Sequence, residues 1–278
     1  MRSLSVCCLL GALFLFASCS KDNDKTTVDD TQGLTRIQTL SNEFHLVDLY
    51  TANGKFQTGY NAIYFQVKTK DGSPVNELSA SWTPIMHMTS MSHSCPASTI
   101  SKKENTQGLY QGYVIFQMAE NQEEYWELKI DYTVNGTSYS AFSRIPVTAA
   151  PRATVQSFQG SDDKRYVLAL VEPVSPKVGL NDMTAALYRM SSMTQFDRVD
   201  NYSIEIDPRM PGMGNHGSPN NVHLVQGTDK LYHGKLSLTM TGYWKINLRL
   251  LDAGSTPIKG EAIEGETTAS SLYFETEF

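Results

Sequence analysis

The sequence predicts an all-β protein with two tandem antiparallel β-sandwich domains, immunoglobulin-like or cupredoxin-like in type. Short segments rich in Val, Ile, Tyr, Phe and Trp alternate apolar with polar residues, and turn residues separate them. No segment reads clearly as a helix. The second half of the chain repeats the motif order of the first half, which indicates a duplication. With 278 residues and 40% hydrophobic residues, the chain is long and apolar enough for two cores.

Residue spacings support the duplication. Met118 and Met240 are 122 residues apart, whereas Trp126 and Trp244 are 118 residues apart. The difference equals the length of a polar turn, residues 121–124, that is missing from the second half. A conserved order with small shifts confined to turns is typical of a repeated domain.

The N-terminal segment predicts a targeting signal that does not belong to the fold. Arg2 precedes an apolar run over residues 6–17, which is too short to span a bilayer. The sequence Phe16-Ala17-Ser18-Cys19 resembles the bacterial lipoprotein signal, with small residues before the cysteine. The resemblance implies that residues 1–18 are a signal peptide, and that Cys19 becomes the acylated N-terminus. An ordinary secretory signal with an incidental cysteine is the alternative.

Residues 19–36 predict a flexible tether, because this polar tract has little apolar surface to bury. We therefore expect a cell-envelope protein held by lipid on Cys19 at the outer membrane, either on its periplasmic face or at the cell surface. The net charge is −6, and no basic patch with interleaved aromatic residues is present. The sequence therefore does not indicate a nucleic-acid partner.

The first domain is expected over residues 37–150. Its predicted strands cover 34–47, 59–70, 109–118, 125–134 and 137–147. Asp71-Gly72 marks the turn after the second of these strands, and Asn135-Gly136 predicts a type I′ hairpin between the last two.

The second domain is expected over residues 151–278. Its predicted strands cover 166–171, 181–192, 196–200, 202–207, 231–240, 242–250 and 271–278. Segment 181–193 is ambiguous, because its Ala, Leu and Met residues suit a helix as well as a strand.

Each domain carries one loop rich in methionine and histidine, at residues 84–96 and 207–219. Candidate ligands in the first loop are Met86, His87, Met88, Met91, His93 and Cys95, and those in the second loop are Met210, Met213 and His216. Thioether, imidazole and thiolate donors together favour Cu(I) over harder ions. Copper is therefore the cofactor that the loops predict.

A structural interpretation of the same residues stands beside this one. Methionine fills gaps in cores, so Met210 and Met213 would cap the second sandwich, while His216 would bond a neighbouring carbonyl. After removal of the signal and acylation of Cys19, Cys95 is the one remaining cysteine, and it is either a buried small hydrophobe or a soft ligand.

One pattern in the second half resembles a known family. Pro208-x-Met210-Pro211-x-Met213-x-x-His216-Gly217, followed by Tyr232-x-Gly234, Met240, Gly242 and Trp244-x-Ile246-x-Leu248, resembles the YtkA-like or FixH-like envelope domain. The first half matches at Pro84 and Met86 but has His87 and Met88 where the family has proline and glycine. The resemblance implies an immunoglobulin-like or cupredoxin-like sandwich, often near copper handling or cytochrome oxidase assembly.

Catalysis is not indicated. The sequence contains no Gly-x-Ser-x-Gly elbow, phosphate loop, His-Glu-x-x-His motif or dinucleotide fingerprint. We therefore expect a non-enzymatic lipoprotein that binds or hands on copper, with an envelope protein as its partner. The alternative is an adhesion or complex-scaffolding lipoprotein that binds a protein or glycan partner without metal.

Overall fold

The computed structural model describes residues 29–278. The predicted signal peptide, Cys19 and most of the tether lie outside the described residues. Residues 29–278 consist of β-strands, turns and one short 3-10 helix, η1 (Pro211–Met213), so the all-β sandwich prediction is confirmed. The ambiguous segment 181–193 forms most of a long strand, β14 (Gly179–Met190). In this part of the chain, no helix is long and apolar enough to cross a bilayer.

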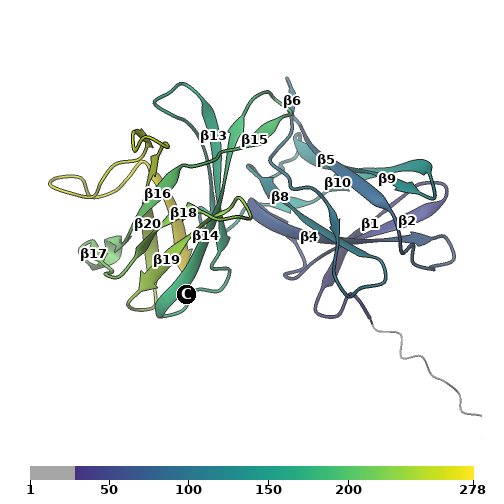
Figure 1. Cartoon of the computed structure of the whole chain (residues 1–278), viewed down its shortest axis with the longest axis horizontal. Coiled ribbons are helices and arrows are strands. Elements are labelled where there is room, and N and C mark those ends of the chain that lie inside the picture. The colour runs from purple at the N-terminus through teal and green to yellow at the C-terminus, as the bar shows by residue number, and fades with distance from the viewer. Residues whose placement is uncertain (1–28) are drawn as a thin grey trace, which may run out of the picture.

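The first half of the described chain builds two antiparallel sheets around one core (Figure 1). The strand order in one sheet is β1 (Thr35–Ser41), β2 (His45–Thr51), β4 (Gly59–Thr69), β8 (Leu109–Phe116) and β7 (Ser101–Lys102). The order in the other sheet is β10 (Thr137–Ile145), β9 (Tyr125–Val134), β5 (Ser79–His87) and β6 (Ser92–His93). A short parallel pair, β3 (Phe56–Gln57) with β11 (Val147–Thr148), completes this half.

The second half repeats this arrangement with one change. Its main strand order is β12 (Val155–Gln159), β13 (Arg165–Glu172), β14, β19 (Tyr232–Leu238), β18 (Val222–Gln226), β16 (Ser203–Met210), β20 (Tyr243–Leu251) and β21 (Pro257–Lys259). Three further strands pair at its sides: β15 (Phe196–Arg198) with β14, β17 (His216–Gly217) with β16, and β22 (Leu272–Glu277) with β20. Because β18 pairs with both β19 and β16, the sheet is continuous and has 11 strands.

Local hydrogen bonds are repeated between the halves, which supports the duplication. The side chain of Asn61 binds both the N–H and the C=O of Gln57, at 3.0 and 2.7 Å. Asn181 makes the same two bonds to Lys177, at 3.0 and 2.8 Å. The glycine two residues before each asparagine has a positive φ, 103° and 111°, a conformation that other residues seldom adopt.

The buried tryptophans repeat a second contact. Trp126 donates its indole N–H to the carbonyl of Met118 at 2.9 Å, and Trp244 donates to the carbonyl of Met240 at 3.0 Å. Both rings are fully buried. A buried indole N–H without a partner would cost free energy, so these bonds fix how the chain enters β9 and β20.

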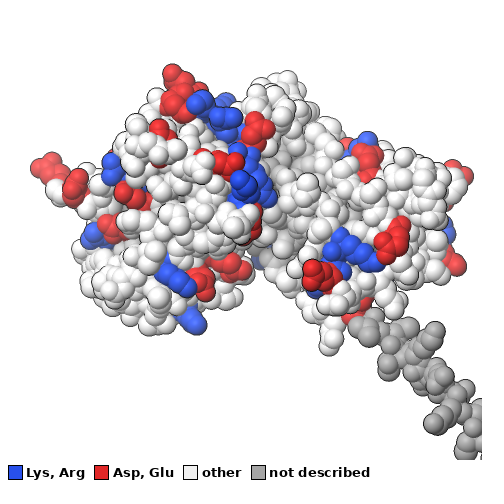
Figure 2. Space-filling view, in the orientation of Figure 1, with Lys and Arg blue, Asp and Glu red and all other residues white. Residues whose placement is uncertain are grey.

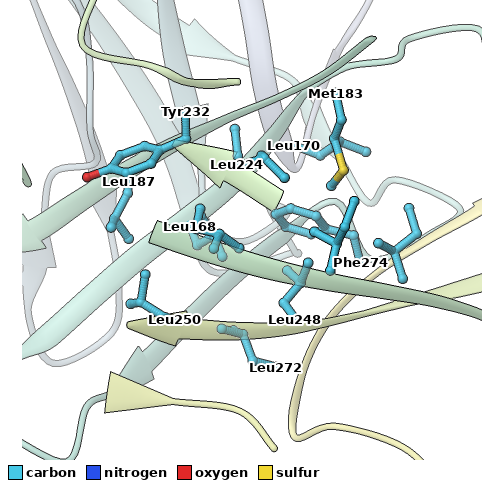
Figure 3. Packing of buried hydrophobic residues seen from close by; sticks show 14 of the residues in the cluster. Leu168, Leu170, Met183, Leu187, Leu224, Tyr232, Leu248, Leu250, Leu272 and Phe274 are labelled. Atoms are coloured by element: carbon cyan, nitrogen blue, oxygen red, sulfur yellow. The ribbon is translucent and has the colours of Figure 1, made fainter. Parts of the chain in front are cut away.

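Each half has its own hydrophobic core. The buried residues of the first core lie between Leu40 and Val147, and those of the second lie between Tyr166 and Phe274 (Figure 3). No residue belongs to both cores. The chain therefore passes from one core to the other between 147 and 166, an interval that contains the expected domain boundary after residue 150.

A third apolar cluster joins the two halves. Its buried members are Tyr113 and Ile115 of β8, Val167 and Ala169 of β13, and Ala186 and Tyr188 of β14. Successive residues of a strand point to opposite faces, so the residues between them on β8 and β14 face the separate cores instead. The two domains thus pack sheet face against sheet face.

Hydrogen bonds lie within this apolar junction. The hydroxyl groups of Tyr113 and Tyr188 are 2.7 Å apart, and Arg198 donates to the Tyr113 hydroxyl at 2.7 Å. Burial raises the pKa of Tyr188 well above its ordinary range, which keeps its hydroxyl protonated. Outside the junction, acidic and basic side chains are interspersed on the face drawn in Figure 2.

Candidate metal-binding loops

The first methionine/histidine loop is a short hairpin at the end of β5. The backbone N–H of Met88 bonds the carbonyl of Met91 at 2.9 Å, which closes a tight turn. The chain then returns as β6, where Met86 lies opposite His93 and His87 lies opposite Ser92. The turn thus brings His93 back beside a methionine seven residues earlier in the chain.

The second loop has the same plan at the end of β16. The 3-10 turn η1 follows Met210, and Gly214 and Asn215 adopt left-handed conformations that reverse the chain. The chain returns as β17, where His216 lies opposite Met210. Each half therefore places a strand-end methionine across from a histidine on the returning strand.

This pairing shows that His93 corresponds to His216. The two histidines are 123 residues apart, close to the 124 residues between Met86 and Met210. In the sequence, His93 is followed by Ser94 and not by the glycine that follows His216, so the pattern does not match the two histidines. The histidine spacing alone was a usable signal.

Three of the nine candidate ligands are buried. Met86 has no exposed surface, Met210 is 5% exposed and Cys95 is 3% exposed, and all three belong to the hydrophobic cores. Burial also raises the pKa of the Cys95 thiol, which disfavours the thiolate that binds metal. The predicted loops at 84–96 and 207–219 are therefore too long, because β5 continues to His87 and β16 to Met210, and strand alternation directs Met86 and Met210 into the cores.

The remaining sulfur donors are more accessible. Met91 is 51% exposed and Met213 is 54% exposed, while Met88 is half-buried against the first core. Met91 and Met213 are therefore the thioethers that an ion from solvent reaches first.

The histidines differ in their surroundings. The Nδ1 atom of His93 lies 2.8 Å from the carbonyl oxygen of Ser94, so it carries the proton and leaves Nε2 with a free lone pair. The ring of His93 meets Trp126 edge-on at 5.7 Å. His216 is exposed, so both of the corresponding histidines present a nitrogen that can bind metal.

His87 faces the opposite side of β5 from Met86. Its ring stacks on Tyr125 at 4.9 Å, and its Nε2 lies 3.9 Å from a carboxylate oxygen of Glu127. That nitrogen is buried and makes no hydrogen bond to the described residues. His87 therefore belongs to the outer face of the sheet and is separated from Met86 by the strand itself.

The two loops lie far apart. In Figure 1, β6 lies where the two halves meet, whereas β17 lies at the outer end of the second half. The backbone N–H of Ser94 bonds the carbonyl of Met193 at 2.8 Å, which connects the first loop to the turn between β14 and β15. The loops therefore cannot share one site within a single chain.

A cavity of about 190 Å³ lies beside the first loop, between the halves. Its lining includes two candidate ligands, Met91 and His93, together with two methionines that the sequence analysis did not single out, Met190 and Met193. Their Met-x-x-Met spacing is visible in the sequence, but the segment contains no Gly or Pro and so does not stand out as a loop. Within residues 29–278, no group of three or more His, Cys, Asp and Glu residues is placed to hold a metal, so a site here needs thioether sulfur.

No family model matches the chain, and no curated protein matches it. Among solved structures, a DUF4785 family protein from Legionella pneumophila is similar to it, with 9% sequence identity and a TM-score of 0.26. The likeness covers 78% of this chain and 55% of that chain, and at this level it carries no argument. The resemblance to YtkA-like or FixH-like domains therefore stays a prediction, and the proposals below depend on the residues of this chain.

Proposed function

We propose that this chain is a non-enzymatic, lipid-anchored protein of the bacterial cell envelope that binds or hands on a soft metal ion, with Cu(I) preferred. One observation carries the proposal: each half places a histidine opposite a strand-end methionine, with an exposed methionine in the turn between them or next to it. The repeated arrangement supports a shared role, because packing alone needs neither the histidine nor the exposed thioether.

The chemistry of the accessible donors favours a soft ion. Met91, His93, Met213 and His216 offer neutral sulfur and nitrogen atoms, whereas Ca²⁺ and Mg²⁺ prefer carboxylate and carbonyl oxygen. Thioethers bind Cu(I) without losing a proton, so their affinity does not depend on titration of the sulfur. Such sites also release the ion readily, which suits transfer to a partner.

The buried methionines have a supporting role in this proposal. Met86 and Met210 anchor the strand ends from which the loops leave, so their packing fixes where His93 and His216 return. Gly242 gives Met210 room, because a side chain there would meet the Met210 methyl group at 3.1 Å. A ligand held on a stiff strand end loses less entropy when it binds.

A titration tests this function. Cu(I) is added to the full chain, purified in mild detergent, in competition with a chromophoric Cu(I) chelator. We expect the natural chain to withdraw Cu(I) from the chelator. A variant with His93→Ala, Met91→Leu, His216→Ala and Met213→Leu should bind at least about tenfold more weakly, the scale on which metal sites respond to lost contacts. Equal binding by the natural chain and this variant would contradict the proposal.

A second candidate function is supported by a different surface. A polar groove of about 750 Å³ lies on β5, β9 and β10, and hydroxyl groups from Ser81, Thr133, Ser138 and Ser140 line it beside Asp131. Hydroxyl and carboxylate groups along a sheet suit a glycan or an extended protein segment, as the adhesion or scaffolding alternative requires. Capture of a partner from solubilised envelope, equally with and without a copper chelator, would favour this function.

A further inference from the structure

The cavity beside the first loop draws its lining from both domains, and strand alternation explains why. Ala186 and Tyr188 of β14 face the first domain, and Met190 continues the same row. On β8, Tyr113 and Ile115 face the second domain, and Gln117 extends that row beyond the end of the strand. The cavity lies where these rows extend past the apolar junction.

The first loop and the β14–β15 turn close this end of the junction. The Ser94–Met193 backbone bond holds the two segments together at 2.8 Å. Met193 is 41% exposed and Met91 is 51% exposed, so both thioethers are reachable from solvent, while Met190 and His93 are half-buried. All four side chains line the same cavity.

One polar atom in the cavity lining lacks a partner. The amide nitrogen of Gln117 donates to Ser157 across the junction at 3.1 Å, but its amide oxygen is buried and makes no hydrogen bond to the described residues. A buried acceptor without a donor is unfavourable, and a nearby cation would relieve that cost. The orphaned oxygen is an observation independent of the methionines, and it shows an acceptor in the cavity lining that a bound ligand could satisfy.

The charges around the cavity favour a monovalent ion. None of the described lining residues is Asp or Glu, and Arg165 is among them. Repulsion from Arg165 grows in proportion to the charge of the ion, so a divalent cation meets twice the repulsion that Cu(I) meets. Neutral sulfur donors without carboxylates also select against Mg²⁺ and Ca²⁺.

We propose that Met190 and Met193 of the second domain complete a Cu(I) site with Met91 and His93 of the first, so that the ion bridges the two domains. This inference rests on the proposed function and assigns its principal site to the domain junction. The second loop, with Met213 and His216, is then a separate and weaker exposed site. Because the ion touches both domains, its binding also stabilises their packing.

The decisive comparison uses conservative variants of the full chain in the chelator competition. Met190→Leu/Met193→Leu keeps side-chain volume and should lower Cu(I) affinity by at least about tenfold. The control, Leu180→Ala, removes an exposed apolar side chain from the other end of β14, outside both loops and the cavity lining, and should change the Cu(I) affinity by less than about twofold. If the natural chain binds no Cu(I), both proposals fail. If it binds and the double variant binds equally well, the bridging site is overturned while the loop-based function stands.

A measurement on the unsubstituted chain guards against a folding defect in the variants. Methionine methyl groups labelled with carbon-13 are followed by NMR while Ag(I), a redox-inert substitute for Cu(I), is added. We expect the methyl signals of Met91, Met190 and Met193 to shift together at the first equivalent, with Met213 shifting later. A first equivalent that shifts Met213 and leaves Met190 and Met193 in place would overturn the bridging site.

Discussion

Substitution of Met86 separates packing from metal binding. Met86 is fully buried at the end of β5, opposite Trp126 on one side and His93 on the other. Met86→Ala leaves a cavity in the first core and should lower the free energy of unfolding by about 2–5 kcal/mol. Met86→Leu conserves volume and should cost less than about 1.5 kcal/mol.

Urea denaturation of the apo chain measures this difference. Tryptophan fluorescence follows both domains, and its first-domain part comes from Trp82 and from Trp126, which lies opposite the substituted residue. Met91→Ala is the matched control, since its half-exposed side chain should change stability by no more than about 0.5 kcal/mol. If Met86→Ala unfolds at the same urea concentration as Met91→Ala, Met86 does not pack in the first core.

Three further predictions concern the junction, the thiol and pH. Tyr113→Phe removes the hydroxyl that binds Tyr188 and Arg198, so it should destabilise the domain junction by about 1–3 kcal/mol. Calorimetry should show unfolding at a lower temperature, and an unchanged unfolding temperature would argue against these hydrogen bonds. Cys95 should react with a thiol reagent far more slowly in the native chain than in urea, because it is buried and its pKa is raised; equal rates would contradict its burial. Burial, together with the positive charge of Lys70, lowers the pKa of His45 below 6.5. As the pH drops from about 6.5, His45 therefore takes up a proton in the unfolded state before it does so in the folded state. The free energy of unfolding should fall over this range, down to the pKa of the folded state. His45→Gln should remove this part of the pH dependence of urea unfolding, and an identical slope in both proteins would refute it.

Much of the fold was predictable because its signals are local. Alternation of apolar residues marked β9 and β20, and Asn135-Gly136 marked the hairpin between β9 and β10. Segment 181–193 was ambiguous because its strand has one row of residues in the core and another in the domain junction. Burial on both faces removes the alternation that identifies a strand.

The candidate site was only partly predictable. The sequence located both methionine/histidine segments but gave them as loops throughout, whereas Met86 lies in β5 and Met210 lies in β16. The correspondence of His93 with His216 was within reach from residue spacing. The burial of Met86 and the contact between Met193 and Ser94 could not be predicted in this way, because both depend on residues distant in the sequence. The packing of one domain against the other determines which methionine and histidine side chains lie close together, and no short sequence motif indicates that packing.

X-ray absorption at the copper edge tests the central claim most directly. The full chain is loaded with one equivalent of Cu(I), and the atoms bound to copper are identified from the spectrum. We predict sulfur neighbours together with nitrogen, and a loss of sulfur in the Met190→Leu/Met193→Leu variant. A spectrum with only nitrogen and oxygen neighbours, or a chain that retains no copper, would contradict the account.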